Sequence, residues 1–418
     1  MQTAHWDLIV IGAGHAGSEL AVAARQAGWA GSILLIGDEE GTPYHRPPLS
    51  KAYLAGQSDR EAIALRPDLA YERASVTRMA GVKVTAIHRE RHEIELAASA
   101  GVLSYGKLAL CTGGRPRPWF CEGMDPNAPA PNNLLYLRTA ADADRLRTWL
   151  QPAARLLVIG AGYVGLEVAA SARATGAEVT VLEAQDRVLA RVAGPALSAF
   201  YEAEHRRHGV QIVTGARVER VHCDGGAIRG VQLAGGRMIE ADVVIAGIGM
   251  LPEVALAMAA GLSGPQGIRV DEHGRTADPD VFAAGDNTQH VHAAYGRALR
   301  IESVPNALEQ ARAVAGWLCG KPRPYTSIPW FWSDQYDLKL QMAGLSEGYD
   351  ACVLRGDPAS RSFCAFYLQG PRLLAVDAVN RPADFMLARR ALAHEQTLDA
   401  GRLSELSIPL KEQLLIPV

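Results

Sequence analysis

The sequence predicts an α/β fold with two dinucleotide-binding units, followed by a small α+β domain. Three observations support this fold class. A glycine-rich motif between an apolar run and an Ala-rich helical run occurs twice. Each copy continues into a second apolar run, which is the pattern of a parallel βαβ unit. After Lys321–Pro324, the pattern changes to short strand-like runs separated by turns.

Each βαβ unit is expected to form a strand, a glycine turn, a helix and a second strand. The expected strands are Asp7–Ile11, Ser32–Ile36, Arg155–Ile159 and Glu178–Leu182, and the helices end near Ala27 and Thr175. In the C-terminal part, the expected strands are Leu338–Met342, Ala351–Leu354, Phe363–Tyr367 and Leu373–Val379, followed by a helix over Ala383–Ala393. Further strands are expected over Lys107–Leu110 and Asp242–Ile245, and the turns after them are plausible domain crossings.

The first glycine motif has the spacing of a dinucleotide fingerprint. Gly12 allows a tight turn, Gly14 lets the backbone approach a pyrophosphate, and Gly17 lets the helix pack on the strand. The helix N-terminus adds N–H groups and partial positive charge for the phosphates. An acidic residue after the second strand, Asp38 or Glu39, is expected to bind the adenosine ribose.

The second glycine motif repeats this logic with Gly160, Gly162 and Gly165, and the acidic residue is Glu183. A carboxylate accepts hydrogen bonds from the ribose hydroxyls of NAD and repels the 2′-phosphate of NADP. At about 4 Å and an effective dielectric constant of about 20, a like-charge pair costs around 4 kcal/mol. That is several hundredfold in affinity before solvent screening. We therefore predict NAD rather than NADP at this site, although Arg187 is near in sequence.

Composition narrows the class of protein. The 418 residues exceed one ordinary hydrophobic core, and 48% hydrophobic with 21% charged residues is typical of a soluble globular enzyme. The net charge of −3 gives no support for nucleic-acid binding. We see no signal peptide, and the apolar stretch Val243–Leu262 is interrupted by Pro252 and Glu253, so neither a membrane span nor export is expected. The cytoplasm is the expected location.

The six cysteines form neither a CxxC pair nor a metal-ligand cluster, so no metal site is predicted. Two dinucleotide sites in one chain imply two different dinucleotides, one held tightly and one exchanging. Thr276–Asp286 resembles the second FAD-binding motif of two-dinucleotide-binding-domain flavoproteins, which have the glutathione-reductase-like fold. In that motif, the aspartate, here Asp286, binds the ribityl chain. Lys107–Gly114 resembles the ATG-like turn of the same superfamily.

A closer likeness covers nearly the whole chain, which resembles the flavin-dependent ferredoxin reductases of oxygenase systems. The matching stretches are Pro47–Lys51, Arg300–Arg312, Trp330–Tyr336, Gly344–Tyr349 and Val376–Pro382. The resemblance implies three domains: a split FAD domain over 1–115 and 244–324, an NAD domain over 116–243, and a C-terminal α+β domain over 325–418.

The resemblance also implies the active-site residues. In similar enzymes, the lysine of the Pro-Pro-Leu-Ser-Lys stretch, here Lys51, lies near the flavin N5. A glutamate in the helix after the second fingerprint, here Glu167, lies near both that lysine and the nicotinamide. A Lys51–Glu167 ion pair is therefore our hypothesis. A cation near N5 favours the reduced, anionic flavin, and the carboxylate keeps the cation in place. Trp332 is expected against the flavin ring and Val304 near its pyrimidine side.

The complete predicted cofactor-binding set joins the two fingerprints to residues implied by the resemblance. Its members are Gly12, Ala13, Gly14, His15, Ala16, Gly17, Asp38, Arg46, Lys51, Val84, Thr112, Gly113, Arg138, Gly285, Asp286, Val304 and Trp332, and Gly160, Gly162, Tyr163, Val164, Gly165, Glu183, Arg191 and Gly249. The expected cofactors are FAD and NAD(H).

The electron acceptor is expected to be external. Disulfide reductases of this superfamily carry a CxxxxC pair soon after the first fingerprint, whereas the first cysteine here is Cys111. The resemblance implies a [2Fe–2S] ferredoxin that serves a cytochrome P450, with Arg66 and Arg312 matching docking positions and a monomer or weak homodimer as the assembly. Alternatives are a Rieske dioxygenase ferredoxin, rubredoxin, a quinone or a small radical as acceptor. A further alternative is a redox signalling protein similar to apoptosis-inducing factor.

Overall fold

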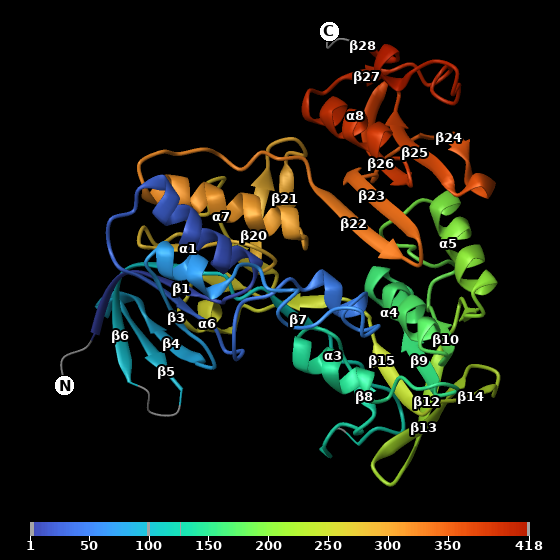
Figure 1. The fold of residues 1–418 in the computed structure, drawn as a ribbon, viewed down its shortest axis with the longest axis horizontal. Coiled ribbons are helices and arrows are strands. Elements are labelled where there is room, and N and C mark those ends of the chain that lie inside the picture. The colour runs from blue at the N-terminus through green and yellow to red at the C-terminus, as the bar shows by residue number, and fades with distance from the viewer. Residues whose placement is uncertain (1–3, 98–100, 126, 416–418) are drawn as a thin grey trace. The chain divides into compact units, whose positions relative to one another are not determined.

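The computed structural model describes residues 4–97, 101–125 and 127–415 of the chain (Figure 1). The chain divides into two compact units. Unit 1 comprises Met1–His45, Arg60–Arg115 and Leu251–Pro329, and unit 2 comprises Arg46–Asp59, Pro116–Met250 and Trp330–Val418. The chain crosses between the units at five points, and two of these lie within the short strands β7 (Gly114–Pro116) and β16 (Met250–Pro252). The expected division into three domains stays a prediction.

Unit 1 is built on a mixed sheet with the strand order β3-β2-β1-β6-β5-β4, and β19 pairs with β6. Its strands are β1 (Ala4–Ile11), β2 (Ile33–Ile36), β3 (Val76–Met79), β4 (Val84–His88), β5 (Glu93–Leu96), β6 (Val102–Leu110) and β19 (Val281–Ala283). β1, β2, β3, β6 and β19 pair in parallel, whereas β4 and β5 form an antiparallel extension. A second sheet pairs β17 (Ser263–Gly264), β18 (Gly267–Arg269), β20 (Thr288–His292) and β21 (Arg297–Leu299).

Both faces of the β1 sheet are buried, which explains why its central strands are continuously apolar. Leu8 and Val10 point into one core with helices α1 (His15–Ala27) and α7 (Val304–Leu318), and Ile9 points into the opposite core with α6 (Ala255–Ala259). Figure 1 shows α1 and α7 side by side over the sheet. Their contact is lined by alanines, whose small side chains permit close helix packing. The remaining helical segments of this unit are α2 (Asp68–Arg73) and η2 (Arg89–Arg91).

Unit 2 contains a parallel sheet with the order β11-β10-β9-β15-β8. Its strands are β8 (Leu134–Leu135), β9 (Arg155–Ile159), β10 (Glu178–Leu182), β11 (Gln211–Val213) and β15 (Val243–Ala246), and its helices are α3 (Ala140–Arg147), α4 (Tyr163–Ala174) and α5 (Pro195–Arg207). An antiparallel sheet of β12 (Val218–Asp224), β13 (Ala227–Leu233) and β14 (Met238–Glu240) covers one side. The 3₁₀ turn η1 (Pro47–Ser50) contacts α3 and α4.

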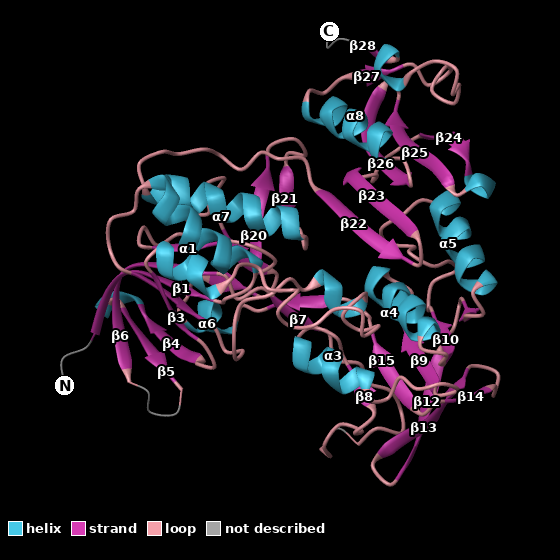
Figure 2. Ribbon diagram, in the orientation of Figure 1, coloured by secondary structure: helices cyan, strands magenta, loops and turns pink. Residues whose placement is uncertain are grey.

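The C-terminal part of unit 2 is an antiparallel sheet with one long helix, drawn in magenta and cyan in Figure 2. Its elements are β22 (Trp330–Gln335), β23 (Leu338–Gly344), β24 (Ala351–Asp357), β25 (Ser362–Gln369), β26 (Arg372–Val379), α8 (Pro382–Ala393), β27 (Thr397–Leu398), β28 (Leu414–Leu415) and the turns η3 (Pro358–Ser360) and η4 (Leu410–Glu412). Its residues Leu338, Leu340 and Phe363 share one hydrophobic core with Val158 and Leu166 of the parallel sheet and α4.

The observed elements confirm the predicted fold class. The second βαβ unit has the predicted strand bounds, and the C-terminal part is α+β as expected. Four strands begin earlier than predicted. β25 and β26 do so by one residue each, whereas β1 begins at Ala4 and β6 at Val102, because their pairing with each other extends both. The strand β22 was not predicted. None of the helices within the described residues has the length and apolar character needed to cross a membrane.

Candidate cofactor and active site

The first glycine turn leaves an open, uncapped helix start. Gly12 has φ +104°, and a Cβ there would lie 2.2 Å from the carbonyl oxygen of Cys111. A Cβ on Gly17 would lie 1.8 Å from the carbonyl oxygen of Gly12, so both positions require glycine. Gly14 differs because a Cβ there would meet no atom within 4 Å. No side chain caps α1 at Gly14, so its first N–H groups point at open space where a phosphate would bind.

The two later FAD motifs of unit 1 lie against this turn. A Cβ on Gly285, which has φ +98°, would be 3.1 Å from the Cβ of Ala16. The Asn287 amide donates to the carbonyl oxygen of Leu110, 3.1 Å, and to the Thr112 hydroxyl, 3.0 Å. The structure thus brings together the fingerprint, the Thr112–Gly113 turn and the Gly285–Asp286 turn. These residues fit the pyrophosphate and ribityl parts of FAD, because the cradle is backbone-lined and open at Gly14.

The acidic residue of the first unit occupies a different position from that of the second. The residue directly after β10 is Glu183, and the equivalent residue directly after β2 is Gly37: each donates its N–H to the next strand of its sheet. A side chain at Gly37 would collide with the Cβ of Ala13 at 2.8 Å. Asp38 is exposed one residue further on, and Glu39 accepts a hydrogen bond from the Tyr44 hydroxyl. A ribose role for Asp38 or Glu39 stays a prediction.

The remaining predicted cofactor-binding residues of unit 1 differ in burial and in their contacts. Val84 is buried in the core beside Ile9 and Leu96, so its side chain supports the fold and only its backbone could contact a ligand. Val304 begins α7 and is partly exposed. His15 Nε2 lies 3.3 Å from Nδ1 of His45, and burial, followed by the charge of Arg66, lowers the pKa of His45.

The second glycine turn has the same construction as the first. Gly160 has φ +101°, and a Cβ on Gly165 would lie 2.2 Å from the carbonyl oxygen of Gly160. Gly162 again has no atom within 4 Å of a built Cβ, and α4 begins there without a side-chain cap. Val164, an apolar residue in the first turn of α4, is 45% exposed beside this opening. The turn therefore has room for a second dinucleotide.

The predicted NAD residues gather around this turn. Glu183 Oε2 accepts the N–H of Ala161 at 2.8 Å, and Oε1 accepts the N–H of Gln185 at 2.9 Å. These two backbone donors hold the Glu183 carboxylate in place. Each of its oxygens has a second lone pair that can accept a hydrogen bond from a ribose hydroxyl. A Cβ on Gly249 would lie 3.7 Å from Arg191 Nη1, so these two predicted residues are neighbours.

The predicted ion pair is present within unit 2. Lys51 Nζ lies 2.7 Å from Glu167 Oε2, and Glu167 in α4 is 3% exposed. Lys51 follows η1, whose two prolines fix the backbone, and its Nζ also donates to the Pro47 carbonyl oxygen at 3.2 Å. Because removing one partner would leave a buried charge unpaired, the two side chains hold each other in place.

Two serines that the sequence analysis did not single out complete the surroundings of Glu167. The Ser50 hydroxyl donates to Glu167 Oε2 at 2.5 Å, and the Ser333 hydroxyl donates to Oε1 at 2.6 Å. Both lie in stretches that carried the family resemblance, directly beside Lys51 and Trp332. Their positions in the sequence, each next to a predicted site residue, could have indicated that these serines belong to the site. With Lys51, three donors therefore surround the Glu167 carboxylate.

Unit 2 also contains four other residues that were predicted to bind the flavin or the nicotinamide, and each makes a contact within the protein. Arg46 donates to the carbonyl oxygen of Arg138 at 2.6 Å. The Tyr163 hydroxyl is 2.7 Å from the sulfur of Met342, and burial raises the pKa of Tyr163 well above its usual value. Trp332 is partly exposed in β22, with its ring 5.6 Å from that of Trp330. Arg46, Lys51, Arg138 and Trp332 belong to unit 2, whereas the first fingerprint belongs to unit 1.

All six cysteines, which lie within the described residues, are free thiols. Burial raises the pKa of Cys111, next to the first turn, to about 12. Such a thiol is not a nucleophile at neutral pH. The structure therefore contains no disulfide in its described part that could take electrons from a bound flavin.

Comparisons with known proteins agree with this geometry. The model of the pyridine nucleotide-disulphide oxidoreductase family matches residues 6–311, and that of the reductase C-terminal family matches residues 330–414. The chain is 46% identical to putidaredoxin reductase CamA of Pseudomonas putida, over 97% of this chain and 96% of that protein. It is 43% identical to the 5,5'-dehydrodivanillate O-demethylase ferredoxin reductase subunit of a Sphingobium species, over 98% of both. Among solved structures, the covalent putidaredoxin reductase–putidaredoxin complex matches with a TM-score of 0.92 and 45% identity, over 98% of both chains.

Proposed function

The chain belongs to the pyridine nucleotide-disulphide oxidoreductase family, and on this premise we propose that it is an FAD-dependent NADH:ferredoxin reductase. It takes electrons from NADH and passes them to a [2Fe–2S] ferredoxin that serves a cytochrome P450. FAD, when bound, accepts a hydride from NADH and releases the electrons singly. The proposal rests chiefly on one observation, the buried Lys51–Glu167 pair beside the second fingerprint.

The chain's own residues have separate tasks in this reaction. The backbone of the Gly12–Gly17 turn binds the FAD pyrophosphate, and the Gly160–Gly165 turn binds that of NADH. Lys51 would supply a positive charge to a reduced, anionic flavin, and Glu167 would keep that charge oriented. Hydride transfer needs donor and acceptor atoms within about 3–3.5 Å, so positioning contributes more than acid–base chemistry.

The external acceptor follows from the thiols and from the relatives. No described cysteine is arranged as a redox pair, so electrons leave the flavin directly. The names of similar proteins contain both a putidaredoxin reductase and a ferredoxin reductase subunit, which supports a ferredoxin as acceptor. The link to a cytochrome P450 rests on the family resemblance of the sequence, and the name of one similar solved structure, the ferredoxin reductase for the CYP199A2 system from Rhodopseudomonas palustris, supports it. A cytoplasmic location and a monomer or weak homodimer complete the proposal.

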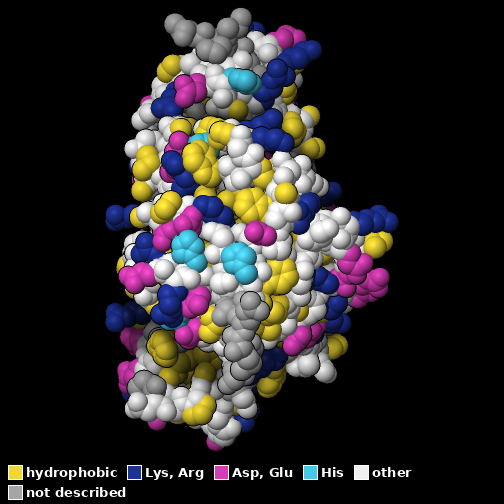
Figure 3. Space-filling model, turned by 90° about the vertical axis from the view of Figure 1, so that its left-hand side faces the viewer, with side chains coloured by type: hydrophobic (Ala, Val, Ile, Leu, Met, Phe, Trp, Pro, Cys, Tyr) yellow, Lys and Arg dark blue, Asp and Glu magenta, His cyan; other side chains and the backbone are white. Residues whose placement is uncertain are grey.

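For docking of the ferredoxin, we propose Arg66 and Arg312. Both guanidinium groups pair with one carboxylate, Glu19 of α1, whose side chain is 9% exposed; Arg312 Nε is 2.7 Å from Glu19 Oε1. Arg312 Nη1 also lies 3.2 Å from Glu309 Oε1, so the two guanidinium groups face two carboxylates. Basic and acidic side chains alternate over the face in Figure 3, and neither sign forms a continuous patch there among the described residues. An acidic partner would be recognised by charge-assisted hydrogen bonds from Arg66 and Arg312.

The test of the proposed site is stopped-flow reduction of the FAD-loaded protein by NADH. Glu167→Gln removes the charge and keeps the shape, and Lys51→Met removes the cation. We expect both variants to retain FAD and to be reduced at least about tenfold more slowly, since a hydrogen bond to a charged group contributes about 1.5–3 kcal/mol. Reduction of both variants at the parent rate would exclude a catalytic role for the pair.

A further inference from the structure

A buried chain of hydrogen bonds leads from Glu167 to helix α5. Beyond the Ser333 hydroxyl, the Gln335 amide nitrogen donates to Ser333 Oγ at 3.1 Å. Gln335 Oε1 lies 2.8 Å from His205 Nε2, and the Tyr336 hydroxyl lies 3.0 Å from His205 Nδ1. Ser333, Gln335 and His205 are each at most 1% exposed. This chain of hydrogen bonds joins α4, β22 and α5 within unit 2.

The chemistry of these groups allows one direction of donation. An amide oxygen only accepts, so His205 Nε2 carries the proton and Nδ1 is the acceptor for the Tyr336 hydroxyl. Gln335 then donates through its nitrogen to Ser333, whose own hydrogen is directed at the carboxylate. Each donor thus points toward Glu167 Oε1. Hydrogen bonds aligned in this way polarise one another, and the last one strengthens in a site of low dielectric constant.

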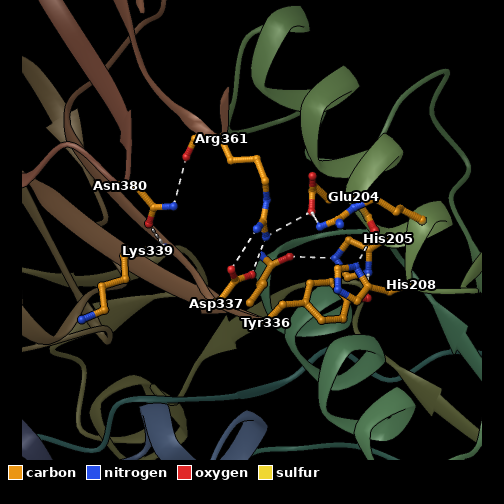
Figure 4. A network of polar contacts seen from close by, with 10 residues as sticks. Glu204, His205, His208, Tyr336, Asp337, Lys339, Arg361 and Asn380 are labelled. Atoms are coloured by element: carbon orange, nitrogen blue, oxygen red, sulfur yellow. Dashed lines mark hydrogen bonds and ion pairs between the residues drawn. The ribbon is translucent and has the colours of Figure 1, made fainter. Parts of the chain in front are cut away.

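The outer end of the chain is held rigidly. Figure 4 shows His205 and Tyr336 beside His208 and the ion pairs of Arg361. The Tyr336 ring stacks on His208, with centroids 3.7 Å apart and planes within 11°, and Arg361 pairs with Glu204 and Asp337. Burial, with a smaller effect from the charge of His208, lowers the pKa of His205 to about 4, against the opposing effects of Gln335 and Glu204. His205 is therefore neutral at physiological pH, as the direction of donation requires.

We infer that Ser333, Gln335 and His205 are positioning residues for the Lys51–Glu167 pair. They hold Oε1 of the carboxylate on the Ser333 hydroxyl, which leaves Oε2 to Lys51 and Ser50. The inference rests on the proposed function, because the pair is given its role there. According to this inference, α5 and β22 influence the rate of flavin reduction, although neither element contains Lys51 or Glu167.

The test compares truncating and conservative variants of each position. Ser333→Ala, Gln335→Met and His205→Leu interrupt the chain, whereas Ser333→Thr keeps the hydroxyl and His205→Gln keeps a donor near the Nε2 position. Tyr201→Phe is the matched control: it lies one turn from His205 on α5, and its buried hydroxyl has no hydrogen-bond partner in the described part of the chain.

We expect the limiting rate of flavin reduction by NADH to fall about tenfold in Ser333→Ala and by less in Gln335→Met and His205→Leu. The NADH dissociation constant should change little, and the two conservative variants and Tyr201→Phe should stay near the parent rate. Infrared spectroscopy provides a readout independent of turnover. The carboxylate stretching bands of Glu167, assigned by their loss in Glu167→Gln, should shift in Ser333→Ala, because Oε1 loses a hydrogen bond.

The outcomes separate this inference from the proposed function. Parent rates in the three truncating variants, with slow reduction in Glu167→Gln, would overturn the positioning role and leave the proposed function intact. Parent rates in Glu167→Gln and Lys51→Met would overturn the proposed function of the pair itself. A rate loss that merely follows lowered urea midpoints, with the Glu167 bands unchanged, would show a structural role and would also overturn the inference.

Discussion

At the scale of single residues, the two fingerprints separate glycines that the fold needs from glycines that a ligand needs. Gly12, Gly17, Gly160 and Gly165 have backbone atoms within 2.6 Å of a built Cβ. Gly14 and Gly162 have open space instead. The close contacts fix the turn, and the open positions leave room for the pyrophosphate.

This difference predicts opposite behaviour for two neighbouring alanine substitutions. Gly14→Ala should fold with parent stability but bind FAD at least about tenfold more weakly, because one charge-assisted contact to phosphate is lost. Gly17→Ala should lower the free energy of unfolding of the apoprotein by about 3 kcal/mol or more, because its Cβ would overlap Gly12. Urea unfolding and FAD titration measure the two effects. Equal loss of stability in both variants would contradict this assignment.

Glu183 provides the residue-scale prediction for nucleotide choice. Glu183→Gln keeps one oxygen acceptor for the turn and removes the charge that repels a 2′-phosphate. We expect the preference for NADH over NADPH, measured as the ratio of kcat/KM values, to fall by about tenfold or more. Glu178→Gln at the exposed start of β10 is the control and should keep the parent ratio. An unchanged ratio in Glu183→Gln would remove Glu183 from nucleotide selection.

At the scale of elements, local patterns predicted the βαβ units because strand, turn and helix lie within one short stretch. The surroundings of Glu167 could not be predicted in this way. Ser50 is 117 positions from Glu167 and Ser333 is 166 positions away, so only the folded chain brings them together. Lys51 itself was assigned through the family resemblance. The predicted end of β2 at Ile36 is correct, but the sequence does not show that the next residue, Gly37, lies against the Cβ of Ala13.

The contact between the C-terminal sheet and α5 predicts a pH dependence of stability. The Tyr367 hydroxyl donates to Asp377 Oδ2 at 2.6 Å and accepts the N–H of Gly194, the N-cap of α5, at 3.0 Å. Burial raises the pKa of Asp377 from 3.8 to about 7, despite the opposing hydrogen bond from Tyr367. Between these values, the folded protein holds more protons than the unfolded chain, so the contribution is complete below pH 3.8 and is lost as pH rises through 7.

Asp377→Asn tests this directly. The free energy of unfolding of the parent should fall by about 3 kcal/mol relative to the variant between pH 5 and pH 8, since each pH unit within the window contributes about 1.4 kcal/mol. Urea unfolding at both pH values supplies the difference, and Asn retains an acceptor for Tyr367. A pH-independent difference between the two proteins would mean that Asp377 is ionised in the folded state.

At the scale of the whole molecule, the protein receives electrons as pairs and delivers them singly to a separate protein. The proposed docking residues, Arg66 and Arg312, have a role only in this second step. Arg66→Ala and Arg312→Ala should each raise the KM for ferredoxin about fivefold at low salt, and less at high salt. Glu19→Gln should instead lower the KM at low salt, because it removes a negative charge that pairs with both guanidinium groups. The reduction of FAD by NADH should be unchanged in all three variants.

Arg220→Ala is the matched control for docking, because Arg220 is an exposed arginine that pairs with Glu122. It should leave the KM for ferredoxin at the parent value. If Arg220→Ala weakens the interaction as much as Arg66→Ala does, the effect reflects total charge, and the local cluster around Glu19 is not the docking site.

The most direct test of the central claim is cytochrome c reduction by the purified flavoprotein, driven by NADH, with and without a [2Fe–2S] ferredoxin of a cytochrome P450 system. We predict a rate that depends strongly on the added ferredoxin and that is much lower when NADPH replaces NADH. Rapid NADH oxidation that is indifferent to the ferredoxin would contradict the account and assign the electrons to a quinone, a small radical or another acceptor.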